Sequence, residues 1–592
     1  MICLIYQLKT GYNISMDVKN LVKHAQGIDA YFAPKQNTYA LSLRAAADFI
    51  RERRAAHGNN ADFSRRYILF VPDKYTLLSE KLLYGSGAGS FDTEALTLNR
   101  LCFRMAENSG KAMREKPLSR LGAILCVRRI LAENADKLGC FKSGARFAGF
   151  GEIMYDNISQ LAACGISSAD LPENERGVLG EKLKAIKFVY SRFEDFTRGK
   201  YVDAAGRMRL LEKMIDEDGE YLGSASVAFA CFDGFTPLAA RIVKKICDIC
   251  GKDNARIFDA DCKLSVAGAN IEEYAASSQA DELKAAALRM RNLSLSGESY
   301  GDMGVIVRDA DCNRLKRIFT EYGVSYFTDE KYALSSHPLA RYLSDLFAAA
   351  KSGTNENYIR LAKNPYSGVA PHEADDFETC VLALSLSEGS MSKKFEFGEL
   401  CDKRLAARLE IAESVRARLH ARVAAVKKRD IRGGEDFAQA IERAVPPDEP
   451  EISAQYCNKF PSAREEILSA VSVIAEVFFG SADYGVMLDA LKECFALREV
   501  GVIPNASGVA EVGDVSAFRA SGKKYLFVLG MHDGELPAVM HDDGMLSDTD
   551  IERIGERAGS RAKIEPSVET LNIRAEEELC SVLSSSENLF LS

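Results

Sequence analysis

The sequence contains no tryptophan and only seven histidines among its 592 residues. None of the histidines falls in an H-E-x-x-H pattern or beside a cysteine set, and no Ser–His–Asp order can be recovered. The first absence excludes the common zinc-hydrolase pattern, in which two histidines one helical turn apart hold the metal. The second excludes the usual acyl-transfer triads. Histidine chemistry is therefore not expected to explain what this protein does.

Long hydrophobic runs are missing as well. The first apolar stretch, Met1 to Tyr6, is interrupted by Gln7 and Lys9. No later stretch reaches the roughly 20 apolar residues that span a bilayer. We therefore expect no membrane segment and no membrane partner, and we place the protein in the cytoplasm.

The sequence also lacks a framework of paired cysteines. Its fifteen cysteines are an odd number and are spread singly along the chain, which is typical of reduced thiols in a cytosolic protein. Cys247 and Cys250 form the only close pair. Because no second pair and no histidine lies nearby, we interpret them as a buried structural pair and not as a metal or redox site.

An excess of positive charge is absent, since 85 acidic residues outweigh 76 basic ones and give a net charge of −9. This excludes a protein that coats nucleic acid with its whole surface, but it allows a local basic groove. In Lys403 to Arg432 basic residues recur three or four positions apart, so one helical face is positive. That face is either a solvated helix surface or a track for a phosphate backbone. The candidate DNA-binding residues are Arg408, Arg416, Arg418, Arg422, Lys427 and Lys428.

What the chain does contain is an alternation of strand–helix units with long helical blocks. Its length predicts three or four domains. Helices are expected at about residues 39–54 and 279–295, and helical blocks at 98–214 and 338–496. Short apolar runs predict strands buried on both faces. These runs are Ile28 to Phe32, Tyr67 to Val71, Ser226 to Phe232, Ala255 to Asp259, Gly304 to Val307, Tyr525 to Leu529 and Leu589 to Leu591, with the α/β pattern resuming at Val509.

Five short sequence segments carry a family resemblance. They are FVPDKYTLLSEKLL from Phe70, FDGFTP from Phe232, ESYGDMGVIVRD from Glu298, HPLARYL from His337 and FVLGMHDGELP from Phe527. In this order and spacing they resemble the AddB subunit of bacterial AddAB (RexAB-type) ATP-dependent helicase/deoxyribonucleases. The resemblance runs from about Ile28 to Ser592, and it stops where AddB would continue into a nuclease domain with an iron–sulfur cluster. We therefore expect this chain to hold only the helicase-like part.

The resemblance implies an α/β fold with two RecA-like parallel-sheet domains, each carrying a mainly helical insertion, as in superfamily 1 helicases. The first RecA-like domain is expected at 24–97 and 216–265, with its insertion at 98–215. The second is expected at 266–337 and 500–592, with its insertion at 338–499. The basic segment 403–432 then lies in the second insertion.

The phosphate-binding loop that the resemblance implies is absent. An ATP-hydrolysing motor needs a glycine-rich loop whose amides surround the phosphates, followed by a lysine and a hydroxyl. Where that loop belongs, residues 33–39 read APKQNTY and contain no glycine. Pro34 removes an amide donor, and the spacing of Lys35 and Thr38 does not match a GK[ST] ending. A working phosphate cradle is not expected here.

Two further nucleotide elements are incomplete. The strand that should end in two adjacent acids ends in Asp233-Gly234, so we interpret Asp233 as a turn residue. Ser585 stands where the resemblance implies an arginine that reaches the γ-phosphate. A serine cannot supply the charge that such an arginine contributes in the transition state. We therefore predict a degenerate ATP site and no catalytic or cofactor-binding residue in this chain.

Carboxylates are not gathered in a nuclease-like pattern. The local acidic patterns include Asp542-Asp543 and Asp548-Thr549-Asp550. We expect Asp548 to cap a helix and the others to be solvated, so no metal ligand is predicted.

Together these features predict a helicase-like subunit that is not a motor. It would bind single- and double-stranded DNA in a double-strand-break repair complex, beside an AddA-type helicase–nuclease subunit. ATP, Mg²⁺ and the iron–sulfur cluster would belong to other parts of such a complex. Two alternatives remain open: an active ATP-dependent helicase/exonuclease subunit, and a scaffold that only holds the AddA-type motor.

Overall fold

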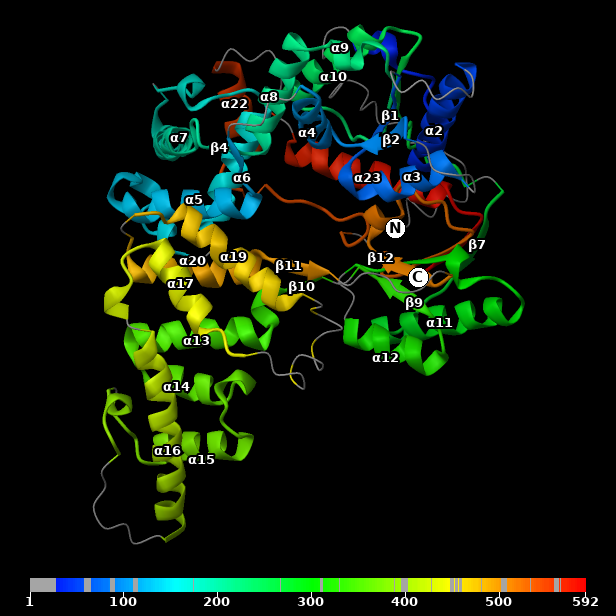
Figure 1. Ribbon diagram of the computed structural model, residues 1–592. Coiled ribbons are helices and arrows are strands. Elements are labelled where there is room, and N and C mark those ends of the chain that lie inside the picture. The colour runs from blue at the N-terminus through cyan, green and yellow to red at the C-terminus, as the bar shows by residue number, and fades with distance from the viewer. Residues whose placement is uncertain are drawn as a thin grey trace.

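The computed structural model describes most of the chain. The described residues are 28–57, 65–85, 91–109, 115–147, 149–173, 175–266, 268–308, 312–329, 331–387, 389–395, 403–426, 428–447, 452, 456, 460, 462–480, 482–501, 508–532, 534–542, 544–557, 564 and 566–592. Figure 1 shows two β-sheets beside a large helical part, from which an arm of helices extends. The protein is thus an α/β protein with parallel sheets and many helices, as the sequence predicts.

The first sheet is parallel and has the strand order β2-β1-β5-β6. Its strands are β2 (Thr93–Leu96), β1 (Tyr67–Phe70), β5 (Ser226–Ala230) and β6 (Ala255–Phe258). Every residue of β1 and β5 is buried, and the rings of Phe70 and Phe229 stack at 4.8 Å. Burial on both faces explains why β1 and β5 read as unbroken apolar runs. The paired strands come from two segments of the chain separated by a long, mainly helical stretch.

Helices cover both faces of this sheet. On one face lie α2 (Tyr39–Ala56) and α3 (Thr76–Tyr84). On the other lie α4 (Leu98–Asn108), α8 (Ala204–Glu217) and α10 (Pro237–Cys250). Cys247 and Cys250 are both buried against this second face, and burial raises the pKa of the Cys250 thiol to about 12. The pair therefore packs as two small apolar side chains.

The second sheet is also parallel, with the order β7-β14-β13-β8-β12-β9. Its strands are β7 (Asn270–Glu273), β14 (Asn588–Leu591), β13 (Tyr525–Val528), β8 (Met303–Ile306), β12 (Ala510–Gly513) and β9 (Tyr326–Thr328). In register, β13 pairs Tyr525 with Asn588 on one side and with Met303 on the other. The strand predicted at Leu589 to Leu591 is therefore an inner member of the sheet.

Helices also cover both faces of the second sheet. One face packs against α11 (Gln279–Leu295) and α12 (Cys312–Tyr322). The other packs against α23 (Val568–Ser584) through Leu579, Val582 and Leu583. Figure 1 shows α23, in red, lying between the two sheets. This helix therefore belongs to the second sheet and faces the first.

The strand predicted at Ile28 to Phe32 is wrong. Asp29–Tyr31 form a 3-10 helix, and the chain then runs beside β6 without forming a regular strand. Only isolated bridges link Phe32 to Ile257 and Gln36 to Ala260. Pro34 lies between these bridges and has no N–H to continue a ladder, so an edge position without regular pairing is the expected result.

Three described strands of the two larger sheets are not predicted by the sequence pattern. They are β2, β7 and β9, and the first two contain glutamate while β7 is largely exposed. Short strands at or near a sheet edge carry no continuous apolar run, so hydrophobicity does not reveal them. The helices predicted at 39–54 and 279–295 are confirmed as α2 and α11.

The two helical blocks share one hydrophobic core. The first contributes α5 (Arg120–Glu133), α6 (Phe150–Ala163) and α7 (Gly177–Thr197), and the second contributes α13 (Pro338–Ser352), α17 (Gly434–Ala444), α19 (Ala463–Val477) and α20 (Tyr484–Leu497). Arg129 joins them by donating to the Val477 carbonyl at 2.7 Å and to the Phe479 carbonyl at 3.1 Å. Two short sheets, β3 (Lys116–Pro117) with β4 (Tyr201–Val202) and β10 (Lys331–Ala333) with β11 (Glu499–Gly501), flank this part.

The arm is built from α14 (Asn355–Ala362), α15 (Pro371–Ala383) and the long α16 (Lys403–Ala425). These helices extend away from the sheets in Figure 1. Further helices are α9 (Glu220–Gly223), α21 (Val515–Phe518) and α22 (Asp548–Arg557). Across the described part of the chain, no helix combines the length and the apolar character that crossing a membrane requires.

Candidate functional site between the two sheets

The start of α2 is the place where the resemblance implies a phosphate-binding loop. Thr38 caps the helix, because its side chain accepts a hydrogen bond from the Leu41 N–H at 3.2 Å. The Tyr39 N–H donates to Ser581 Oγ of α23 at 3.0 Å, and both groups are buried. Amides in the first turn of a helix have no partner within the helix. Here two of them are satisfied by hydroxyl groups of the protein.

Lys35 lies just before this turn and is the candidate for a phosphate-binding lysine. It faces an acidic residue of the first sheet. Its Nζ lies 2.9 Å from Asp259 Oδ2, just after β6. Burial opposes the charge on the lysine, yet the hydrogen bond and charge of Asp259 raise its pKa. The lysine is therefore held as a cation by a carboxylate of its own chain.

Arg519, which follows α21, reaches from the second sheet to the first. Its guanidinium forms an ion pair with Asp233, and its Cζ lies 3.7 Å from the centre of the Tyr39 ring. Glu578 Oε1 of α23 is 3.8 Å from Nη1. The arginine side chain is only 4% exposed. Although burial works against its charge, the pKa of Arg519 is raised because Tyr39 and Asp233 lie against the guanidinium.

Two neighbouring glutamates of α23 complete the contact between the sheets. Burial raises the pKa of Glu577 and of Glu578. Arg519 opposes this shift at Glu578, whereas Asp259 adds to it at Glu577. Buried carboxylates carry a desolvation cost unless cations compensate it. The groups Lys35, Tyr39, Asp233, Arg519, Glu577, Glu578 and Ser581 thus form one polar contact, which we call the inter-sheet cluster.

The sequence indicates only part of the inter-sheet cluster. It singles out Lys35, Thr38 and Asp233, and the structure brings all three to this region. Ser585 lies one turn beyond Ser581, where its Oγ donates to the Val582 carbonyl of its own helix at 2.7 Å. Arg519 and Ser581 give no sequence signal, because each acts on residues hundreds of positions away and neither belongs to a motif.

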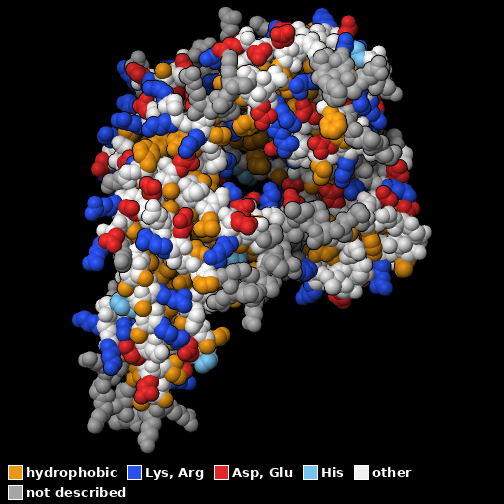
Figure 2. Space-filling model, viewed as in Figure 1, with side chains coloured by type: hydrophobic (Ala, Val, Ile, Leu, Met, Phe, Trp, Pro, Cys, Tyr) orange, Lys and Arg blue, Asp and Glu red, His pale blue; other side chains and the backbone are white. Residues whose placement is uncertain are grey.

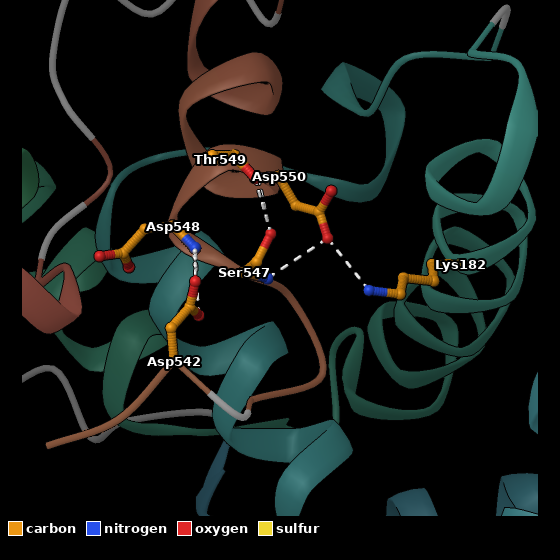
Figure 3. Close-up of polar contacts among 6 residues, drawn as sticks. All are labelled: Lys182, Asp542, Ser547, Asp548, Thr549 and Asp550. Atoms are coloured by element: carbon orange, nitrogen blue, oxygen red, sulfur yellow. Dashed lines mark hydrogen bonds and ion pairs between the residues drawn. The ribbon is translucent and has the colours of Figure 1, made fainter.

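The acidic residues near α22 do not converge on a metal. Figure 3 shows the carboxylates of Asp542, Asp548 and Asp550 pointing in different directions. Asp550 Oδ2 accepts from Lys182 Nζ at 3.0 Å, and Asp542 accepts from the Asp548 N–H at 3.3 Å. No group of His, Cys, Asp or Glu side chains that could hold a metal occurs among the described residues. Asp543 lies outside them.

The prediction that Asp548 caps its own helix is wrong. Ser547 does so, since its Oγ accepts from the Asp550 N–H at 3.2 Å. The Asp548 carboxylate instead accepts from the Val568 N–H at 3.0 Å, at the start of α23. An acid at that position suits the positive end of the helix dipole. Asp548 therefore fixes α23 against α22.

The basic segment of α16 is largely occupied by contacts within the second helical block. Arg416 is buried, lies 2.7 Å from both carboxylate oxygens of Glu413, and donates to the Met391 carbonyl at 3.0 Å. Arg422 donates to Tyr342 Oη at 3.1 Å and to the Tyr366 carbonyl at 3.0 Å. These two arginines stabilise the packing of the arm.

The other candidates in this segment are more exposed. Arg408 Nε lies 3.2 Å from Asp376 Oδ1, and Arg418 Nη2 lies 2.8 Å from Glu373 Oε2. Lys428 donates to the Lys351 carbonyl at 3.3 Å. Lys427 falls outside the described residues. Figure 2 shows the Lys and Arg side chains of the arm interspersed with Asp and Glu.

Figure 2 also shows a hollow near the middle of the viewed face. In Figure 1 this position lies below α23 and above β11, between the sheets and the shared helical core. The hollow thus lies beside α23 and the shared helical core on this side of the molecule.

Comparison with known proteins adds independent support for the resemblance. Residues 48–257 match the family described as ADDB, N-terminal. The chain is 23% identical to the B subunit of the ATP-dependent helicase/deoxyribonuclease of Alkaliphilus metalliredigens, over 83% of the chain and 51% of that protein. It is 21% identical to the corresponding protein of Clostridium novyi, over 83% of the chain and 50% of that protein. For Alkaliphilus oremlandii the identity is 22%, over 86% and 52%.

The chain therefore spans about half the length of the curated relatives it matches. Its matched family domain covers most of the first sheet, and the relatives match 83–86% of the chain. The parallel sheets with helical blocks agree with the helicase-like fold that the resemblance implies. Over most of its length the chain is thus similar to the B subunits of ATP-dependent helicase/deoxyribonucleases, and residues 48–257 match the family described as ADDB, N-terminal.

Proposed function

We propose that this protein is a non-motor, DNA-binding subunit of a helicase–nuclease complex that acts in recombinational repair of double-strand breaks. The names of its relatives support a role in such a complex. The inter-sheet cluster supports the absence of motor activity. In this proposal the chain follows a DNA strand without hydrolysing ATP.

The observation that carries the proposal is that groups of the protein itself already bind the amides in the first turn of α2. Phosphate binding at a helix start requires free amides and a close approach of the ligand. Here Ser581 Oγ and Thr38 Oγ1 accept from two of the amides, and Asp259 holds Lys35. Arg519 covers Tyr39 and pairs with Asp233. A nucleotide would have to displace all of these contacts, so the site is best understood as a degenerate one.

The partner and the location belong to the same proposal. The relatives are named as subunits, which supports an obligate companion. We propose that this companion is an AddA-type helicase–nuclease subunit in the cytoplasm. ATP, Mg²⁺ and any iron–sulfur cluster would reside elsewhere in that complex. The domain division given from the sequence remains part of this proposal, with residues 24–97 and 216–265 as the first RecA-like domain and 266–337 and 500–592 as the second.

The DNA contact is proposed to involve the exposed cations of the basic segment 403–432. Arg408, Arg418 and Lys428 combine exposure with charge, whereas Arg416 is buried. Each exposed cation already touches an acid or a carbonyl, so it would exchange that contact for phosphate. Because such pairs at a surface are weak, the exchange costs little.

Retention on immobilised single-stranded DNA at low salt tests the proposal. The expected result is retention that falls steeply as salt rises, because phosphate contacts release counterions. A combined Arg408→Gln, Arg418→Gln and Lys428→Gln variant should elute at lower salt, and Lys213→Gln, an exposed lysine of α8, should behave as the unaltered protein. Failure of the unaltered protein to bind at low salt would leave only the protein-scaffold alternative.

A further inference from the structure

A cavity of about 640 Å³ lies in the second helical block, where the start of α13, the end of α14 and α20 meet. Five charged side chains line it: Arg341, Asp345, Arg360, Lys363 and Lys492. Four of the five are cations, in a protein whose net charge is −9. We call this cavity the α13–α20 pocket.

The cations of the pocket keep donors available. Arg341 uses Nε to donate to the Ser335 carbonyl at 3.1 Å, which leaves the two Nη groups of its guanidinium. Lys492 is exposed and makes no ion pair with any residue that the structure describes. Both residues therefore present hydrogen-bond donors to whatever enters the pocket.

The acids that pair with the other two cations lie on the far side. Arg360 pairs with Glu356, and Lys363 Nζ lies 2.5 Å from Glu378 Oε2. Both glutamates line a separate groove of about 720 Å³, which Arg360 and Lys363 also border. The acids are thus absent from the lining of the α13–α20 pocket, although two cations stand between the two spaces. Arg341 and Lys492 are therefore the cations of the lining that have no acidic ion-pair partner among the described residues.

Asp345 is the single acid of the pocket. Burial raises the pKa of its carboxyl, and Arg360, Lys492 and Arg341 act in the opposite direction. These cations surround the carboxylate without forming an ion pair with it, as far as the described residues show. Because Glu356 and Glu378 pair with Arg360 and Lys363, Arg341 and Lys492 are left against the single half-buried carboxylate of Asp345. This excess of positive charge attracts anions.

We infer that the α13–α20 pocket binds a phosphate group, supplied by the backbone of a nucleic-acid strand. Its volume falls within the usual range of ligand pockets, and Arg and Lys donors are the groups that bind phosphate oxygens. The inference deepens the proposed DNA-binding function and rests on it for the source of the phosphate. A free phosphate ion shares the chemistry, so the test must separate the two sources.

Three variants test the pocket with a fluorescent oligothymidylate in an anisotropy titration. Lys492→Gln and Arg341→Gln should each weaken binding by about fivefold at low salt and reduce the salt slope by about one. Asp345→Asn should instead tighten binding several-fold, because it removes the only negative charge of the lining. Lys213→Gln, an exposed lysine in the other helical block, is the matched control and should not change affinity.

Two of the variants are expected to weaken binding and Asp345→Asn is expected to tighten it. Misfolding cannot explain this pattern, since a damaged protein would not bind more tightly. If all three pocket variants bind the oligonucleotide as the control does, while the unaltered protein binds, the strand does not use this pocket and the wider DNA-binding proposal stands.

A thermal-unfolding measurement with inorganic phosphate distinguishes the two sources of the phosphate group, a nucleic-acid backbone and a free phosphate ion. Phosphate should raise the melting temperature of the unaltered protein, and the rise should be lost in Lys492→Gln. If the oligonucleotide fails to bind but this rise is seen, the pocket takes free phosphate and the DNA-binding proposal fails. If neither probe distinguishes the pocket variants from Lys213→Gln, the inference is overturned.

Discussion

The backbone N–H of Tyr39 donates a hydrogen bond to Ser581 Oγ at 3.0 Å, across 542 residues of sequence. Tyr39 begins α2 under the first sheet, and Ser581 lies in α23, which packs on the second. One buried hydroxyl thus satisfies a helix-start amide and joins the two sheets. In an active motor that amide would face a phosphate.

Ser581→Ala should lower the free energy of unfolding by about 1–3 kcal/mol, because it leaves the buried Tyr39 amide without a partner. Ser585→Ala is the matched control at the end of the same helix. The Ser585 hydroxyl donates to the Val582 carbonyl of its own helix and reaches no other element through that bond, so the change should stay within about 0.5 kcal/mol. Urea denaturation measures both values, and equal losses would contradict the role given to Ser581.

Arg519→Ala should destabilise the protein by about 3 kcal/mol or more, since it leaves the Asp233 carboxylate and its neighbours without their buried cation. Arg519→Lys should recover part of the loss, because lysine restores charge but not the planar contact with Tyr39. Arg317→Ala, at an exposed position of α12, serves as the control. A loss at Arg519 no larger than at Arg317 would show that the inter-sheet cluster does not hold the sheets together.

Gly304→Ala should destabilise the second sheet. A Cβ added at Gly304 in β8 would lie 2.6 Å from Cε1 of Phe518, the residue before Arg519. Relieving this overlap must move Phe518 or the strand, at a cost of about 1–3 kcal/mol. Gly223→Ala is the control, because an added Cβ there meets no atom within 4 Å. Thermal unfolding of the two variants measures the difference, and similar melting temperatures would contradict this packing.

Stability should fall in mild acid because of His337. Burial lowers the pKa of this histidine from 6.5 to about 4, so the unfolded chain binds a proton in this interval and the folded chain does not. The contribution of His337 is therefore complete above pH 6.5 and is lost as the pH falls towards 4, by about 3 kcal/mol at most.

The variant that tests this is His337→Asn. Asparagine can still accept the Leu339 N–H that His337 Nδ1 accepts at 3.2 Å. Its free energy of unfolding should vary less between pH 6.5 and 4 than that of the unaltered protein. An unchanged slope in the His337 variant would show that another group titrates.

The sequence predicts the strands of the two sheets better than it predicts the contacts between the sheets. Tyr67 to Phe70 and Tyr525 to Val528 are recognisable because burial on both faces demands a continuous apolar run. The polar edge strand β7 gives no such signal, and the bridges at Phe32 replace a predicted strand because Pro34 cannot donate. Arg519 and Ser581 escape prediction for another reason. Their partners depend on how the two sheets pack against each other. No local sequence pattern predicts a contact between residues so far apart in the chain.

The basic segment shows the same limit. Its spacing predicts one positive face on α16, and the helix is confirmed. Spacing cannot reveal that Arg416 pairs with Glu413 and that Arg422 meets Tyr342, because those partners depend on how the arm packs. The α13–α20 pocket likewise combines residues from Arg341 to Lys492, which no local pattern links.

The central proposal is that this helicase-like protein does not bind ATP, because its own side chains occupy the start of α2. Titration of the purified chain with a fluorescent ATP analogue in the presence of Mg²⁺ tests it most directly. We predict no saturable signal, in the unaltered protein or in the Ser585→Ala variant. Saturable binding that unlabelled ATP displaces, and that Lys35→Ala weakens, would contradict the claim and would favour an active motor.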